Sequence, residues 1–161
     1  MPAGAGEVDL SGDKFRVLLG VIERWTNGTE CGYVILRHMF DLLAMINTKD
    51  GALQTRCLAP VINDSGETVD FTSVLAEALL TYAKLSPKDD KELQSLCRFQ
   101  QVGLDLATNF VKASNEVDAT NIMTLLQRPI LVNLRNQRNG VEQVHLACMS
   151  ILNVAVVMWL L

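Results

Sequence analysis

The sequence has little of what catalytic or metal-binding chemistry needs. Its 161 residues include only two histidines, His38 and His145, so a histidine-based site has few ways to form. The Gly-rich phosphate loop, the dinucleotide-binding fingerprint, the nucleophile elbow and the H-E-x-x-H zinc motif are all absent. We therefore expect no catalytic residue, no cofactor and no metal ligand, and we expect that the chain is not an enzyme.

A disulfide framework and a secretory signal are also missing. The four cysteines are scattered through apolar runs without a C-x-x-C pair, which is typical of buried thiols in a reducing compartment. The first residues, 1–7, have neither a basic region nor an apolar region of a signal peptide. These features predict an intracellular protein, either cytoplasmic or nuclear.

The charge of the chain is mildly acidic, and its apolar content is high. The net charge is -4, so no general attraction to nucleic acid is expected. Hydrophobic residues make up 49% of the chain, and the mean hydropathy is +0.20. Such an excess indicates either a large core or an apolar surface that lies against something else.

Apolar residues recur at helical spacing through most of the chain, and no stretch shows sustained strand alternation. We predict an all-α fold of antiparallel helix pairs, with a flexible tail over residues 1–12 and a single helical domain over 13–161. Helices are expected over roughly 13–27, 31–47, 70–85, 87–113, 117–134 and 141–161.

Local signals predict where several helices start and pack. Ser86 as cap and Pro87 at the first helical position predict a helix start, and Ser114 or Asp118 is expected to cap the next helix. Pro129 predicts a kink or a new start within that helix. Gly103 lies inside a predicted helix, where it indicates close helix packing.

The spacing of the helices suggests a repeat. Long helical stretches begin near residues 31, 70 and 117, each followed by a partner, and turns such as Asn27-Gly28 and Asn139-Gly140 separate neighbours. The separations of roughly 40 and 47 residues match two- or three-helix units, so the chain resembles an armadillo/HEAT-type α-solenoid. The resemblance implies stacked helix pairs with an extended surface for partner peptides or helices. A compact helical bundle would give the same pattern.

One basic strip is the candidate partner-binding site. Residues 119–141 contain Arg128, Arg135 and Arg138 and no acidic residue. The first two arginines are seven positions apart, so they share a helix face. Four amide side chains, Asn133, Asn136, Gln137 and Asn139, extend the strip. Guanidinium groups can bind an acidic segment of another protein, although a solvated helix face is the simpler interpretation.

The last residues, 146–161, carry no charged side chain. They predict a buried terminal helix, or an apolar face that the next repeat of a longer helical-repeat protein would cover. A membrane anchor is the alternative, although a spanning helix needs about 20 apolar residues. Glu142, His145 and Cys148 lie near one face of this helix, and His145 with Cys148 could supply half of a zinc site, completed by Cys31 or His38. The simpler interpretation is that His145 lies at the boundary of the core and that Cys148 lies within it.

The predicted function is therefore a protein–protein interaction or scaffold module that binds a partner peptide or helix. The absence of catalytic motifs agrees with this function, because helical repeats bind partners without catalytic residues. The alternative is a membrane-associated helical protein anchored by residues 146–161.

Overall fold

The computed structural model describes residues 12–27, 33–48, 57, 59–62, 65–136 and 140–160. In this part of the chain, six helices of 13 residues or more account for most of the structure: α1 (Gly12–Asn27), α2 (Tyr33–Thr48), α4 (Phe71–Ala83), α5 (Asp90–Ala113), α6 (Glu116–Arg135) and α7 (Glu142–Leu160). The all-α prediction is confirmed. The predicted tail lies outside the described residues except for Gly12, which begins α1, and so do Gly28 and Asn139 of the two predicted turns.

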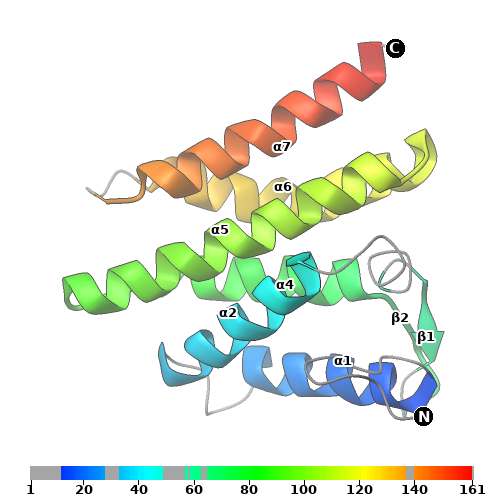
Figure 1. Ribbon diagram of the computed structural model, residues 1–161, viewed down its shortest axis with the longest axis horizontal. Coiled ribbons are helices and arrows are strands. Elements are labelled where there is room, and N and C mark those ends of the chain that lie inside the picture. Colours follow the sequence, from blue (N-terminus) through cyan, green and yellow to red (C-terminus); the bar gives the residue numbers. More distant parts are fainter. Residues whose placement is uncertain are drawn as a thin grey trace.

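The helices pack in antiparallel pairs that form two layers (Figure 1). Helices α2, α5 and α7 are successive neighbours in one layer, and α1, α4 and α6 are successive neighbours in the other. The side-chain contacts show the antiparallel sense: α7 meets α6 through His145 near Asn133 and through Trp159 near Thr120. Helix α7 therefore lies at one edge of the stack, and α1 lies at the opposite edge.

A short β-hairpin precedes α4, although no strand was expected. Strands β1 (Val61–Ile62) and β2 (Thr68–Val69) pair in antiparallel fashion, with Val61 opposite Val69 and Ile62 opposite Thr68. Gly66 takes a positive φ of 81° in the connection, which glycine adopts without a steric penalty. Two-residue strands are too short to show an alternating pattern, which is why the sequence did not reveal them.

Helix α5 begins later than predicted. Its N-cap is Asp89, whose carboxylate accepts a hydrogen bond from the Glu92 backbone N–H at 2.8 Å. The Glu92 carboxylate in turn accepts from the Lys88 backbone N–H at 2.9 Å, so two N–H groups at the helix start are satisfied. The predicted start at Ser86–Pro87 is wrong, because this reciprocal pair forms three residues further on.

Helix α6 also differs from its prediction at two points. Asn115 is its N-cap and accepts from the Asp118 backbone N–H at 2.8 Å, whereas Ser114 is the C-cap of α5. Neither predicted cap is therefore the one used. No new helix starts at Pro129, because α6 continues through it, and the Asn133 side chain donates to the Pro129 carbonyl at 3.0 Å.

The core lies between the two layers and is filled by large aromatic and aliphatic side chains. Edge-to-face aromatic pairs join neighbouring helices, with ring centroids 5.2 Å apart for Tyr82 and Phe99 and 5.8 Å apart for Phe71 and Phe110. Gly103 allows α4 and α5 to approach closely, since a Cβ there would lie 2.7 Å from Leu79 Cδ2. The close packing predicted at this glycine is confirmed.

A chain of hydrogen bonds between buried amides runs across four helices. Gln100 Nε2 of α5 donates to the Leu79 carbonyl of α4 at 2.9 Å, and Asn133 Nδ2 of α6 donates to Gln100 Oε1 at 2.9 Å. The His145 ring Nε2 of α7 lies 3.0 Å from the Asn133 carbonyl. Gln100 and Asn133 are only 1% and 6% exposed, so their amides rely on these partners rather than on water.

Candidate interaction surface

The predicted basic strip lies on α6, in the terminal helix pair. Arg128 and Arg135 are both exposed, and they share the outward side of the helix with Leu131, which is 50% exposed. We name Arg128, Leu131 and Arg135 the Arg–Leu stripe. The third predicted residue, Arg138, lies outside the described residues, as do Gln137 and Asn139.

The amide part of the predicted strip does not join this surface. Asn133 points into the core, where it hydrogen-bonds to Gln100 and to the Pro129 carbonyl. Asn136 is half-buried and ends α6 as its C-cap. The interpretation of Asn133 as a surface residue is wrong, because its partner Gln100 comes from a helix 33 residues away.

Within the described part of the chain, the positive charges of the Arg–Leu stripe have no carboxylate paired with them. No acidic residue occurs between Ala119 and Val141, and no described carboxylate pairs with the Arg128 or Arg135 guanidinium. The acidic residues of α6, Glu116 and Asp118, lie in its first turn. The stripe therefore presents two cations, about two helical turns apart, on either side of an apolar side chain.

A second exposed surface lies on α7, which the sequence predicted to be a buried terminal helix. Only one side of α7 is buried, and the residues on it are Val144, Ala147, Cys148, Ile151 and Ala155. Leu146, Met149, Val156 and Val157 are 48–60% exposed, and they share the outer face of α7 with the exposed polar residues Gln143, Ser150 and Asn153. Helix α7 packs mainly against α5 and α6, on the side opposite its exposed face.

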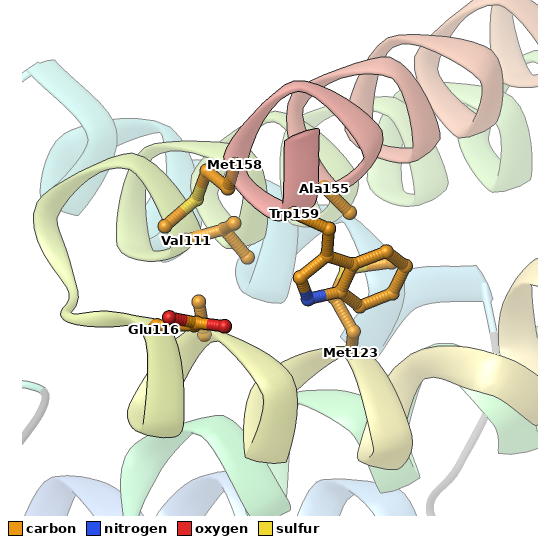
Figure 2. A pocket seen from close by; sticks show the side chains of 7 residues that line it. Val111, Glu116, Met123, Ala155, Met158 and Trp159 are labelled. Atoms are coloured by element: carbon orange, nitrogen blue, oxygen red, sulfur yellow. The ribbon is translucent and has the colours of Figure 1, made fainter. Parts of the chain in front are cut away.

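Trp159 closes the far end of the α6–α7 pair (Figure 2). Its indole lies over Met123, and its Nε1 donates to Thr120 Oγ1 at 3.4 Å. The hollow beneath it, lined by Val111, Ala155 and Met158 among others, is too narrow to admit a water molecule. Trp159 therefore covers the end of the core and does not line a ligand site.

A wider hollow of about 800 Å³ lies where the start of α5 meets the turn before α7. Its lining mixes charges of both signs, with Asp90, Lys91 and Arg98 among its residues. The Cys97 thiol donates to the Gly140 carbonyl at 3.6 Å, and burial, aided by the nearby Glu142 carboxylate, raises the pKa of this thiol. At neutral pH the thiol stays protonated, so the hollow holds no activated cysteine nucleophile.

The residues considered for a metal site have structural partners instead. His145 is half-buried and contacts the Asn133 carbonyl, and Cys148 is buried in the core. Burial raises the pKa of the Cys148 thiol to about 11, which disfavours the thiolate that a metal requires. Within the described residues, no group of three His, Cys, Asp or Glu side chains is placed to hold a metal ion, and Cys31 lies outside them.

Comparison of the chain with protein-family models, with curated proteins and with solved structures gave no match.

Proposed function

We propose that this chain is a protein-interaction or scaffold module that binds an acidic segment of another protein through the Arg–Leu stripe. The observation that carries the proposal is that Arg128 and Arg135 are exposed on one side of α6, with an exposed leucine between them and no described carboxylate paired to either. This arrangement leaves both guanidinium forks available for bidentate contacts with carboxylates.

The chemistry of the stripe selects one class of partner. An amphipathic helix with an apolar residue flanked by acidic residues one turn away on each side would match Leu131 and the two arginines. Arginine suits such a contact because its planar guanidinium keeps its charge and binds carboxylates in a fixed geometry. Electrostatic contacts of this kind are screened by salt, so binding should weaken as ionic strength rises.

The armadillo/HEAT-type solenoid is part of this proposal. Three antiparallel helix pairs follow one another in two layers, and each helix neighbours the corresponding helix of the next pair. This is the arrangement expected of stacked repeats, in which each unit contacts only its neighbours and the stack offers an extended surface. A reducing intracellular location, predicted from the cysteines, remains a prediction.

The test measures binding of a fluorescently labelled 20-residue amphipathic peptide. The peptide carries two Glu residues seven positions apart, with a Leu between them. The double variant Arg128→Glu/Arg135→Glu should weaken binding at least tenfold. The matched control Lys91→Glu/Arg98→Glu changes the net charge equally on exposed residues of α5 and should change binding by less than about threefold. Equal losses in the two double variants, or no binding by the wild type, would contradict the proposal.

Membrane association is the second candidate, and α7 is the observation that favours it. Residues Glu142–Trp159 form the one described segment long and apolar enough to cross a membrane, with a mean hydropathy of 1.3 and 28% of the window buried. The core helix of a soluble protein passes the same test of length and composition. Flotation of the purified chain with phosphatidylcholine vesicles, lost in the variant Leu146→Glu/Val157→Glu, would support this function over the first.

A further inference from the structure

Helix α6 carries opposite charges at its two ends. Its acidic residues, Glu116 and Asp118, lie in the first turn, and Arg135 lies in the last turn, with Arg128 about two turns before it. This order agrees with the helix dipole, which favours acidic side chains at the start of a helix and basic side chains at its end. The Arg–Leu stripe is therefore the basic half of a longer surface that begins with an acidic residue.

Asp118 is the acidic residue that belongs to this longer surface. It is exposed, and it lies seven positions before Leu125 and so on the same side of the helix. Asn115 Nδ2 donates to Asp118 Oδ2 at 3.1 Å, and a carboxylate can accept further hydrogen bonds. Glu116, by contrast, lines the narrow hollow beneath Trp159, on the side of α6 that faces α7.

Exposed apolar side chains connect the acidic end to the basic end. Val117 is 69% exposed, Leu125 is 41% exposed and Leu131 is 50% exposed. We name Val117, Asp118, Leu125 and the Arg–Leu stripe together the charged face of α6. From Asp118 to Arg135 this face extends over 17 positions, about 25 Å, so a partner helix of about 20 residues would cover it.

The helix dipole also selects the direction of a partner helix. A stable partner helix has acidic residues in its first turns and basic residues in its last turns, as α6 itself has. Antiparallel to α6, such a helix brings its acidic turns to Arg128 and Arg135 and its basic turns to Asp118. Parallel to α6, it would place like charges opposite one another at both ends, which opposes binding.

A second copy of α6 matches this face less well. Pairing Asp118 with Arg135 of a second copy in antiparallel fashion puts the two-fold axis between Leu126 and Gln127. The two Arg128 side chains would then lie about 5 Å apart along the helix axis, where their charges repel each other. The charges therefore favour a different protein, with a carboxylate opposite each arginine.

From these charges and exposures we infer that the partner is an amphipathic helix of about 20 residues that lies antiparallel to α6. Its carboxylates, near its amino end, contact Arg128 and Arg135, and a cation near its carboxyl end contacts Asp118. Apolar side chains of the partner lie between these two contacts. This pairing rests on the proposed function, to which it adds the charge order and the direction of the partner.

The test compares three labelled amphipathic peptides of about 24 residues that differ only in charge order. The first carries two Glu residues seven positions apart near its amino end and two Lys residues in its last turn. The second has Glu in place of both Lys residues, and the third has the charge order of the first reversed from end to end. At about 20 mM salt, where screening is weak, the first should bind at least about fivefold more tightly than either of the others.

A charge reversal at Asp118 tests which residue reads the basic end of the peptide. Asp118→Lys should reverse the preference between the first and second peptides, because the new ammonium repels Lys and attracts Glu. The matched control Asp90→Lys removes an exposed first-turn carboxylate of α5 in the same way and should keep the wild-type preference. Both variants should keep the wild-type far-ultraviolet circular dichroism. A preference that Asp118→Lys leaves unchanged overturns the inference, as does equal binding of the first and third peptides.

Failure of the charge order is distinguishable from failure of the proposed function. Equal binding of all three peptides, lost in Arg128→Glu/Arg135→Glu, would keep the proposed function and overturn the antiparallel charge order. Absence of binding by every peptide would overturn both. A chain mass that doubles with concentration in the wild type, but not in Asp118→Lys, would assign the charged face to a second copy and overturn the inference.

Discussion

Helices α4 and α7 are almost equally apolar, but they have different surroundings. Eight of the 13 residues of α4 are buried, because α1, α5 and α6 all pack against it. Helix α7 packs against α5 and α6 and leaves Leu146, Met149, Val156 and Val157 exposed. Apolar composition therefore predicts how much surface a helix can bury, whereas its place in the stack decides how much it does bury.

The strongest test of this comparison removes the same side chain from each helix. Leu79 of α4 is fully buried, so Leu79→Ala should cost about 2–5 kcal/mol of unfolding free energy through lost contacts and a cavity. Leu146 of α7 is 60% exposed, and Leu146→Ala should change the stability of the monomer by less than about 0.5 kcal/mol. Urea unfolding near 1 µM measures both, and losses of similar size would show that α7 is covered in the folded monomer.

A second test concerns the hydrogen bonds that connect α4 to α7 through side chains of α5 and α6. Asn133→Ala leaves the buried Gln100 Oε1 without its donor and should cost about 1–3 kcal/mol. Asn121→Ala, on the exposed side of the same helix, is the matched control and should change stability little. A double-mutant cycle with Gln100→Ala should show coupling, and additive losses would mean that the two amides stabilise the fold independently.

The N-terminal ends of α4 and α7 should also differ in how much they contribute to stability. Asp70 caps α4 by accepting hydrogen bonds at 2.7 Å from the Ser73 backbone N–H and from Thr72 Oγ1, so Asp70→Ala should cost about 1 kcal/mol. At the start of α7, the exposed Glu142 carboxylate accepts from the Gly140 backbone N–H at 3.4 Å, a longer contact. Glu142→Ala should therefore destabilise the chain less in the same unfolding assay, and a larger loss would contradict this ranking.

The last test concerns a pH dependence expected from the buried thiol of α7. Burial raises the pKa of the Cys148 thiol from 9.0 to about 11. Below pH 9 the folded and unfolded chains both keep this proton, so the thiol adds no pH dependence there. Between pH 9 and 11 the unfolded chain loses it first, and the folded state should lose stability relative to the Cys148→Ala variant. Urea unfolding at pH 7.5 and pH 10 compares the two chains, and parallel pH profiles would contradict the shift.

Much of the helical architecture could be predicted from sequence, because it depends on patterns within one segment. The end of α5 at Ala113 and the close packing at Gly103 are confirmed. The start of α5 was missed because Ser86 and Asp89 are both good cap residues, and only the bond between Asp89 and Glu92 distinguishes them.

The candidate surface was predicted less completely. Arg128 and Arg135 are exposed as expected, but Asn133 is not, because its burial depends on Gln100 from another helix. The sequence of α7 has apolar residues on both sides of the helix. Which of the two sides is exposed depends on the position of α7 relative to α5 and α6, and the sequence pattern does not contain that information.

The hydrogen-bonded amides of Gln100 and Asn133 also fix the alignment of neighbouring helices along their axes. Apolar ridges look similar after a shift of one turn, about 5.4 Å, so hydrophobic packing alone would permit several alignments. After such a shift, the Gln100 and Asn133 amides would be buried without their partners, at about 1–3 kcal/mol for each unsatisfied group. Helices α4, α5, α6 and α7 therefore have one preferred alignment, and the Arg–Leu stripe and the outer face of α7 keep a constant offset from each other.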